Sequence, residues 1–356
     1  TQHFFNFYLF CRIFQDGEGK MNKKKLLTII ACIFVLAVVL LGIAFNANDN
    51  KNLTTGEHVI ITVAPGMTNA DIATMLQNKK MINSPGFFRL QSKFARMERS
   101  LQAGEYEIMS GMSNWEIIGL FSKGQVRHKT LTIPEGYTIE QIAKKIEESG
   151  LGSAEEFKKA AKDYAPYSYM ETDNSNVIFK AEGFAYPSTY YLSPGSTEKE
   201  ILSVMVKEFD EQLTEDIRQK AKEKNMSIRD LVSLASLVEK EAVFPEERPI
   251  IAGVFLKRLQ IKMPLQSDTT IQYILGVQKK EISIADTKID SPYNTYLYAE
   301  LPPGPIASPS ISTINAVLEP KQTNYLYFVA DLEGHHHFTE TYQEHLQEIE
   351  KIHGPQ

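Results

Sequence analysis

The feature that most constrains this chain is an uncharged run at residues 26–45, with the sequence LLTIIACIFVLAVVLLGIAF. A helix rises about 1.5 Å per residue, so a run of this length can cross a hydrocarbon core about 30 Å thick. Lys23, Lys24 and Lys25 precede the run, and basic residues favour the cytoplasmic side of a membrane. The sequence therefore predicts a single-pass cell-membrane protein with a cytoplasmic N-terminus and an extracytoplasmic remainder.

The segments that flank this run complete the expected N-terminal organisation. A cleaved signal peptide is the alternative interpretation, but its apolar region usually has about 7–15 residues and ends at a small-x-small site. The sequence NANDN at residues 46–50 supplies no such site, which favours an uncleaved transmembrane helix. Because Met21 followed by Asn-Lys-Lys-Lys looks like an ordinary start, we expect residues 1–20 to be a translated upstream leader. Residues 21–25 then form a short basic cytoplasmic segment.

Charge and cysteine content exclude two classes of protein. The formal net charge of the 356 residues is −6, and five basic against two acidic residues before position 26 leave −9 on the rest. A nucleic-acid binder would need a basic surface, so no nucleic-acid partner is expected. The chain has 2 cysteines, one in the expected leader and one in the expected membrane helix. The extracytoplasmic part is therefore expected to be stabilised by packing, not by disulfides.

An internal repeat organises the first extracytoplasmic part. Residues 63–76 (VAPGMTNADIATML) and residues 133–146 (IPEGYTIEQIAKKI) align at a constant offset. Each copy predicts a short strand, a glycine turn, and a helix that begins after a threonine N-cap. Asp71 or Gln141 stands three residues after that threonine, which is the spacing of a capping box.

The repeat and the residues around it predict a small α+β module at residues 57–130, after a linker at residues 46–56. A further strand is expected at residues 103–108 and a further helix at residues 117–122. The order strand, helix, helix, strand is the outline of a LysM-like module. Such a module can grip glycan, and it can equally act as a spacer.

Residues 131–356 predict a second, helix-rich α+β domain, in which the helix at residues 227–242 carries the most informative carboxylate. On a helical wheel of about 100° per residue, Glu241 lies on the apolar face. Glu239 lies at the margin of that face and Lys240 on the solvent side. Burial and the helix C-terminus both disfavour a charged carboxyl, so a raised pKa suited to a general acid is expected for Glu241. The alternative is a structural glutamate paired with Arg248 or Arg258.

Several clusters further along combine aromatic, amide and hydroxyl side chains, as carbohydrate clefts do. Each cluster also has a structural interpretation, because Tyr-Pro and Pro-Pro-Gly sequences are common in turns. Three adjacent histidines at residues 335–337 lack an HExxH or CxxC frame. Neither a metal site nor a cofactor is therefore expected.

Six linked motifs then give the chain a family resemblance over about residues 21–350. They are ASLVEKE at 235–241, LQSD at 265–268, SPYNTY at 291–296, LPPGPI at 301–306, YFVAD at 327–331, and GHHHF at 334–338 followed by Glu344-His345. In this order the motifs resemble those of the endolytic murein transglycosylases, the YceG-like family. Leu332 departs from the family pattern, which has glycine after the aspartate.

The resemblance implies an enzyme that cleaves the β-1,4 bond between N-acetylmuramic acid (MurNAc) and N-acetylglucosamine (GlcNAc) in peptidoglycan, leaving a 1,6-anhydroMurNAc end. The residue that acts as catalytic acid and base in this family corresponds to Glu241, which the helical wheel also places on the apolar face. The spacing back from Glu344-His345 selects His336 among the three histidines. The expected substrate-binding residues are Tyr190, Gln266, Ser267, Asp268, Tyr293, Asn294, Tyr296 and His336.

Two other functional classes stay open. A muramidase-type hydrolase would place a second carboxylate, Asp268, across the cleft from Glu241. A non-catalytic wall-binding or scaffold protein would need neither carboxylate.

The resemblance also implies peptidoglycan strands as substrate, and penicillin-binding proteins and the elongation machinery as partners.

Overall fold

The computed structural model describes residues 23–47, 57–96, 100–277, 279 and 281–354. The chain divides into two compact units, Thr1–Arg127 and His128–Gln356, and each is described by itself. The expected leader at residues 1–20 and almost all of the expected linker at residues 46–56 lie outside the described residues. The expected boundary at residue 131 falls inside a strand that begins at Lys129.

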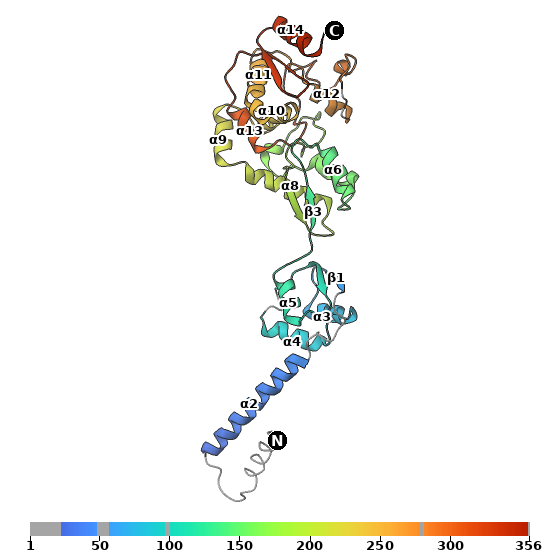
Figure 1. Ribbon diagram of the computed structural model, residues 1–356, viewed down its shortest axis with the longest axis vertical. Coiled ribbons are helices and arrows are strands. Elements are labelled where there is room, and N and C mark those ends of the chain that lie inside the picture. Colours follow the sequence, from blue (N-terminus) through green and yellow to red (C-terminus); the bar gives the residue numbers. More distant parts are fainter. Residues whose placement is uncertain (1–22, 48–56, 97–99, 278, 280, 355–356) are drawn as a thin grey trace, which may run out of the picture. The chain divides into compact units, whose positions relative to one another are not determined.

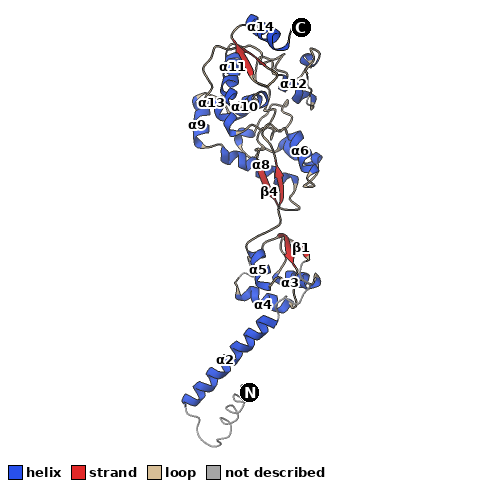
Figure 2. Cartoon of the chain, viewed as in Figure 1, coloured by secondary structure: helices blue, strands red, loops and turns tan. Residues whose placement is uncertain are grey.

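Helix α2 (Lys23–Ala47) contains the uncharged run on which the membrane prediction rests (Figure 2). Within the described part of the chain, no helix is long and apolar enough to cross a membrane. The single-pass helix therefore stays a prediction.

The remaining elements of the first unit form a small α+β fold (Figure 1). They are β1 (His58–Val63), α3 (Asn69–Asn78), α4 (Pro85–Phe94), β2 (Gly104–Met109) and α5 (Asn114–Ser122). Strand β1 pairs with β2 in antiparallel fashion, with Ile61 opposite Tyr106. Both side chains are fully buried, and the Tyr106 ring meets Phe121 edge to face at 4.6 Å. The strand predicted at residues 103–108 and the helix predicted at residues 117–122 correspond to β2 and α5, whereas α4 was not predicted.

The two copies of the internal repeat have the same local structure. Thr68 and Asp71 form a capping box at the start of α3, and Thr138 and Gln141 form one at the start of α6 (Ile139–Glu148). The prediction of two capping boxes is confirmed. The turn glycine before each threonine has a positive φ, a conformation that glycine adopts without a Cβ clash.

The second unit is larger and mostly helical. Beyond α6, its helices are α7 (Ala154–Asp163), α8 (Glu198–Gln212), α9 (Glu215–Glu223), α10 (Ile228–Glu241), α11 (Arg248–Gln260), α12 (Asp268–Leu275), α13 (Ile311–Leu318) and α14 (Tyr342–His353). Its short 3-10 turns are η2 (Ser168–Met170), η3 (Pro245–Glu247) and η4 (Asp286–Lys288). Its strands are β3 (Lys129–Thr132), β4 (Thr189–Leu192), β5 (Tyr327–Ala330) and β6 (His336–Thr339).

The strands of the second unit form short ladders. Among the described residues, β3 pairs with β4 and β5 pairs with β6, both antiparallel. These ladders are too short to make a sheet layer, so the helices supply most of the core. The chain is thus mixed and helix-rich, as the α+β prediction requires.

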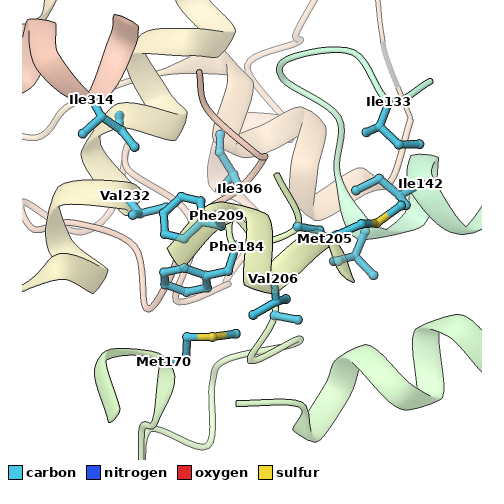
Figure 3. Close-up of a cluster of buried hydrophobic side chains, with 14 of the residues drawn as sticks. Ile133, Ile142, Met170, Phe184, Met205, Val206, Phe209, Val232, Ile306 and Ile314 are labelled. Carbon is cyan, nitrogen blue, oxygen red and sulfur yellow. The ribbon is translucent and has the colours of Figure 1, made fainter. Parts of the chain in front are cut away.

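Helix α10 is the central element of the second unit. It contacts α9, α11, α12 and α13, and all its residues from Leu231 to Val238 are buried. Figure 3 shows Val232 of this helix among the side chains of the core, with Phe184 and the α8 residues Met205, Val206 and Phe209. Because α10 is enclosed on several sides, its C-terminal turn is held in a fixed position.

Candidate active site

Glu241 is the last residue of α10 and contacts the segment at residues 267–269. The Ser267 hydroxyl donates a hydrogen bond to its Oε1, and the Thr269 hydroxyl donates to the same oxygen at 3.4 Å. The two hydroxyls are themselves 2.6 Å apart. Within the described part of the chain, no hydrogen bond reaches Oε2. One carboxyl oxygen is therefore held while the other is available to a ligand.

The surroundings of Glu241 favour its protonated form. Burial raises the pKa of this carboxyl above its ordinary value, and the negative charge of Asp268 raises it further. The Ser267 hydrogen bond and a positive charge on His336 act in the opposite direction, but burial has the largest effect. The pKa direction expected from the sequence is confirmed. A carboxyl that keeps its proton closer to neutral pH can serve as a general acid.

Glu239, two residues earlier, has a different environment. Its Oε1 accepts a hydrogen bond from Arg248 at 3.0 Å, and its Oε2 accepts from the Ser310 backbone at 2.9 Å and from the Thr313 hydroxyl at 2.5 Å. These contacts fix the N-terminus of α13 to α10. The arginine pairing considered for Glu241 is therefore made by Glu239 instead.

The position predicted for Lys240 from the helical wheel is wrong. The wheel places it on the solvent side, but its side chain is half-buried, and its ammonium donates to the Gly136 carbonyl at 3.3 Å. The second repeat copy covers this side of the last turn of α10. The wheel could not show this contact because Gly136 lies far from Lys240 in the sequence.

Hydrogen bonds connect the LQSD segment, which contacts Glu241, to the SPYNTY segment. The Gln266 backbone, at φ +51°, donates to the Thr295 carbonyl at 3.0 Å. The Ser267 backbone donates to the Thr295 hydroxyl at 3.1 Å. Gln266 is exposed and Ser267 is buried. Thr295 thus sets the position of the hydroxyl that contacts Glu241, a role that the sequence analysis did not give it.

Asp268 and Tyr296 form a second polar contact on the same side. The Tyr296 hydroxyl donates to Asp268 Oδ1 at 2.5 Å, and burial raises the pKa of this phenol above its ordinary value. Asp268 is exposed at the start of α12. Both predicted residues therefore lie at the accessible side of the group around Glu241.

His336 is the histidine that influences Glu241 electrostatically. Its Nδ1 lies 2.7 Å from Glu247 Oε2, its backbone donates to Glu247 Oε1 at 3.1 Å, and its side chain is 5% exposed. His335 stacks on Phe244, and its Nδ1 lies 3.4 Å from Glu247 Oε1. Among the described residues, no group of three or more histidines, cysteines and carboxylates could hold a metal ion.

Three other predicted binding residues are buried. The Asn294 amide donates to the carbonyls of Thr287 and Ile289, and its oxygen accepts from the Tyr296 backbone. Tyr293 is 2% exposed and Tyr190 is 5% exposed, and the Tyr190 hydroxyl donates to the Tyr186 carbonyl. The structure thus places these three side chains within the protein and not at the surface around Glu241.

A buried carboxyl that the sequence analysis missed is Glu182. It accepts hydrogen bonds from the Ile139 backbone at 3.0 Å and from the Tyr273 hydroxyl at 3.1 Å. Burial raises its pKa to about 8. Glu182 lies in an irregular segment, where no hydrophobic period marks a residue as buried. It links the start of α6 to α12.

Comparisons with known proteins give the chain relatives over most of its length. The YceG-like family matches residues 61–351. The endolytic murein transglycosylase of Bacillus subtilis is 32% identical over 305 residues, which cover 82% of this chain and 84% of that protein. The endolytic murein transglycosylase of Streptococcus pneumoniae D39 is 31% identical over 328 residues, which cover 84% of this chain. The chain spans only 58% of that relative's length.

A solved structure supports the fold. The crystal structure of a yceG-like protein from Listeria monocytogenes aligns with a TM-score of 0.58 and 32% sequence identity. The alignment covers 83% of this chain and 99% of that chain. The family match spans both units and includes Glu241 and all the residues that contact it. This chain belongs to the YceG-like family.

Proposed function

We propose that this chain is an endolytic lytic transglycosylase that cleaves the MurNAc-β-1,4-GlcNAc bond of nascent peptidoglycan strands, with Glu241 as general acid and base. The observation that carries the proposal is the arrangement of Glu241. Its Oε1 is held by hydroxyls, its Oε2 is left to a ligand, and burial favours its protonated form. The names of the relatives provide the substrate class.

The reaction needs one carboxyl that works twice. Glu241 donates its proton to the glycosidic oxygen as the bond from that oxygen to C1 of the muramyl residue breaks. The carboxylate then takes the proton of the muramyl C6 hydroxyl, whose oxygen closes on C1 to form the 1,6-anhydro ring. Because the nucleophile belongs to the substrate, the atoms balance without water. A second carboxylate is not required.

Asp268 supports a second candidate, a muramidase-type hydrolase. It is exposed and its charge influences the pKa of Glu241, as a partner carboxylate across a cleft would. Its Oδ1 already accepts a short hydrogen bond from Tyr296. This contact favours a binding role for Asp268, so the transglycosylase is the preferred function.

The N-terminal part fits the same function. We propose that residues 26–45 anchor the chain in the cell membrane and leave the residues after them outside. The first unit, with its order β1, α3, α4, β2, is proposed as a LysM-like module that contacts glycan strands near the membrane. Penicillin-binding proteins and the elongation machinery, which produce these strands, are the proposed protein partners.

The test is digestion of uncrosslinked nascent glycan strands by the full chain, with the products identified by mass spectrometry. A transglycosylase gives products one water molecule lighter than hydrolysis products. Glu241→Gln keeps the shape but cannot donate a proton, so cleavage falls by about 10²–10⁴-fold. Glu246→Gln, at an exposed glutamate nearby, is the matched control and retains full cleavage.

The other outcomes separate the alternatives. Products without the loss of water would identify a hydrolase, and Asp268→Asn would then abolish cleavage. Absence of cleavage by the wild-type chain would contradict the enzymatic proposal and favour the scaffold function. Full cleavage by Glu241→Gln would exclude Glu241 as the general acid.

A further inference from the structure

A cavity in the second unit lies next to Glu241 and has no role in the bond-breaking steps above. Its volume is about 410 Å³. One wall includes Thr269, whose hydroxyl donates to Glu241, and another includes Lys240, the chain neighbour of Glu241. The second repeat copy contributes Thr138 and Gln141 to the lining. A substrate group bound here would lie close to the bond that Glu241 is proposed to cut.

Lys240 gives this cavity an unbalanced positive charge. Its half-buried ammonium donates to the Gly136 carbonyl, and within the described residues no carboxylate lies within 4.0 Å of it. Burial lowers the pKa of Lys240, as expected for a cation without a close anionic partner. The cavity therefore offers a favourable place for a carboxylate from a ligand.

The acidic residues near Lys240 do not supply that carboxylate. Glu140 lines the same cavity, but its Oε2 pairs with Lys158 at 3.4 Å. Glu239 is occupied by Arg248 and the start of α13. The pKa of Glu241 is raised, and this carboxyl influences Lys240 without forming an ion pair with it. The charge on Lys240 is thus left to a bound molecule.

The rest of the lining fits a short peptide. Phe179, Ile178 and Ile306 supply apolar surface, and the Gln141 and Gln272 amides can bind backbone groups. The peptide stem that each muramyl residue carries has small side chains, amides and free carboxylates, whereas GlcNAc carries no charge. We propose that the cavity binds the stem peptide of the muramyl residue at the cut bond, with Lys240 pairing with a stem carboxylate.

This inference rests on the proposed function, and binding can test it without cleavage. The full-length Glu241→Gln chain, purified in detergent, is titrated by calorimetry with a GlcNAc-MurNAc disaccharide that carries its stem peptide. The same disaccharide with every stem carboxylate converted to an amide is the comparison ligand. We expect the amidated ligand to bind about tenfold more weakly, as for one lost charge-assisted hydrogen bond.

Variants place this loss at Lys240. Adding Lys240→Met weakens binding of the carboxylate ligand about tenfold and removes the difference between the two ligands. Lys199→Met, at an exposed lysine, is the matched control and leaves both affinities unchanged. A disaccharide with a bare lactyl carboxylate separates the two sources of negative charge. If it binds as tightly as the stem-bearing ligand, the stem peptide is not what the cavity recognises.

The two proposals fail in distinguishable ways. Equal affinity for the carboxylate and amide ligands would overturn the stem-peptide site, and this measurement does not depend on the folding of any Lys240 variant. The wild-type chain would still cleave glycan strands in that case. Absence of cleavage by the wild-type chain would instead contradict the proposed function, whatever the ligands show.

Discussion

The two copies of the internal repeat have the same local structure but opposite surroundings. Both helices begin with a threonine N-cap and a complete capping box, Thr68 with Asp71 and Thr138 with Gln141. In the first unit, Thr68 and Asp71 are exposed. In the second, Thr138 and Gln141 line the cavity beside Glu241. A short sequence can thus specify a helix start, while its chemical use depends on what the rest of the unit places next to it.

The carboxylate at each helix start shows this difference most clearly. In α3 the carboxylate is Asp71, whose pKa is lowered by its hydrogen bonds to Thr68. In α6 a buried carboxylate, Glu182, comes from a distant segment and accepts from the Ile139 backbone. Burial raises the pKa of Glu182 to about 8. The starts of two similar helices therefore favour the charged form of a carboxyl in one and the neutral form of a different carboxyl in the other.

The largest difference in stability between the two copies is expected when these carboxyls are removed. Glu182→Ala leaves the Ile139 N–H and the Tyr273 hydroxyl without their acceptor and should lower the free energy of unfolding of the second unit by about 3 kcal/mol. Asp71→Ala leaves exposed groups that water can satisfy, so its effect should be smaller. Urea denaturation measures both, with the fluorescence of Trp115 reporting on the first unit. Equal effects would contradict the comparison.

The pH dependence of stability should also have opposite sign in the two units. Glu182 binds its proton more tightly in the folded state, so its contribution is present below its ordinary pKa of 4.5 and is lost as pH rises towards about 8. Asp71 has a lowered pKa, so its contribution is present above 3.8 and is lost as pH falls.

Glu182→Gln provides the test of this second prediction. The variant should flatten the pH dependence of the second unit between about pH 5 and about pH 8, measured by circular dichroism during urea denaturation. Trp115 fluorescence should show no change in the first unit. An unaltered pH slope in the second unit would show that Glu182 is charged in the folded protein.

Removal of each threonine cap gives a smaller and more even effect. Thr68→Ala and Thr138→Ala should each cost about 1 kcal/mol, the usual value of a lost N-cap. Only Thr138→Ala should also lower kcat/KM for glycan strands, because Thr138 lines the cavity beside Glu241. Equal activity of the two variants would mean that the second copy has no part in substrate binding.

The smallest expected effects are shifts in the pH profile of cleavage. A general acid must be protonated, so kcat/KM should fall as pH rises through the pKa of Glu241. Asp268→Asn removes a negative charge that raises this pKa, so the alkaline limb should move to lower pH. Thr269→Val removes a hydrogen bond that lowers the pKa, so the limb should move to higher pH. Shifts with the opposite signs would contradict the assignment of this limb to Glu241.

Local patterns predicted the helix starts and the environment of Glu241, because capping spacing and helical periodicity act over a few residues. The same periodicity placed Lys240 in solvent, since the covering Gly136 segment is distant in sequence. Glu182 was missed because its burial depends on α6 and α12 together. Motif residues such as Asn294 hold a loop in place with their polar groups. A sequence pattern alone does not distinguish such a structural residue from one that binds substrate.

One further contact bears on how the protein is made. Arg258 donates to the carbonyl of Leu265 and to the carbonyl of Leu326, so a single side chain joins the segment around Ser267 to the start of β5. During synthesis, Glu241 is added to the chain before Arg258, Ser267 and His336. A truncated chain that stops short of β6 would contain the acid without its completed surroundings. The surroundings of Glu241 are therefore completed only when the polypeptide is nearly finished.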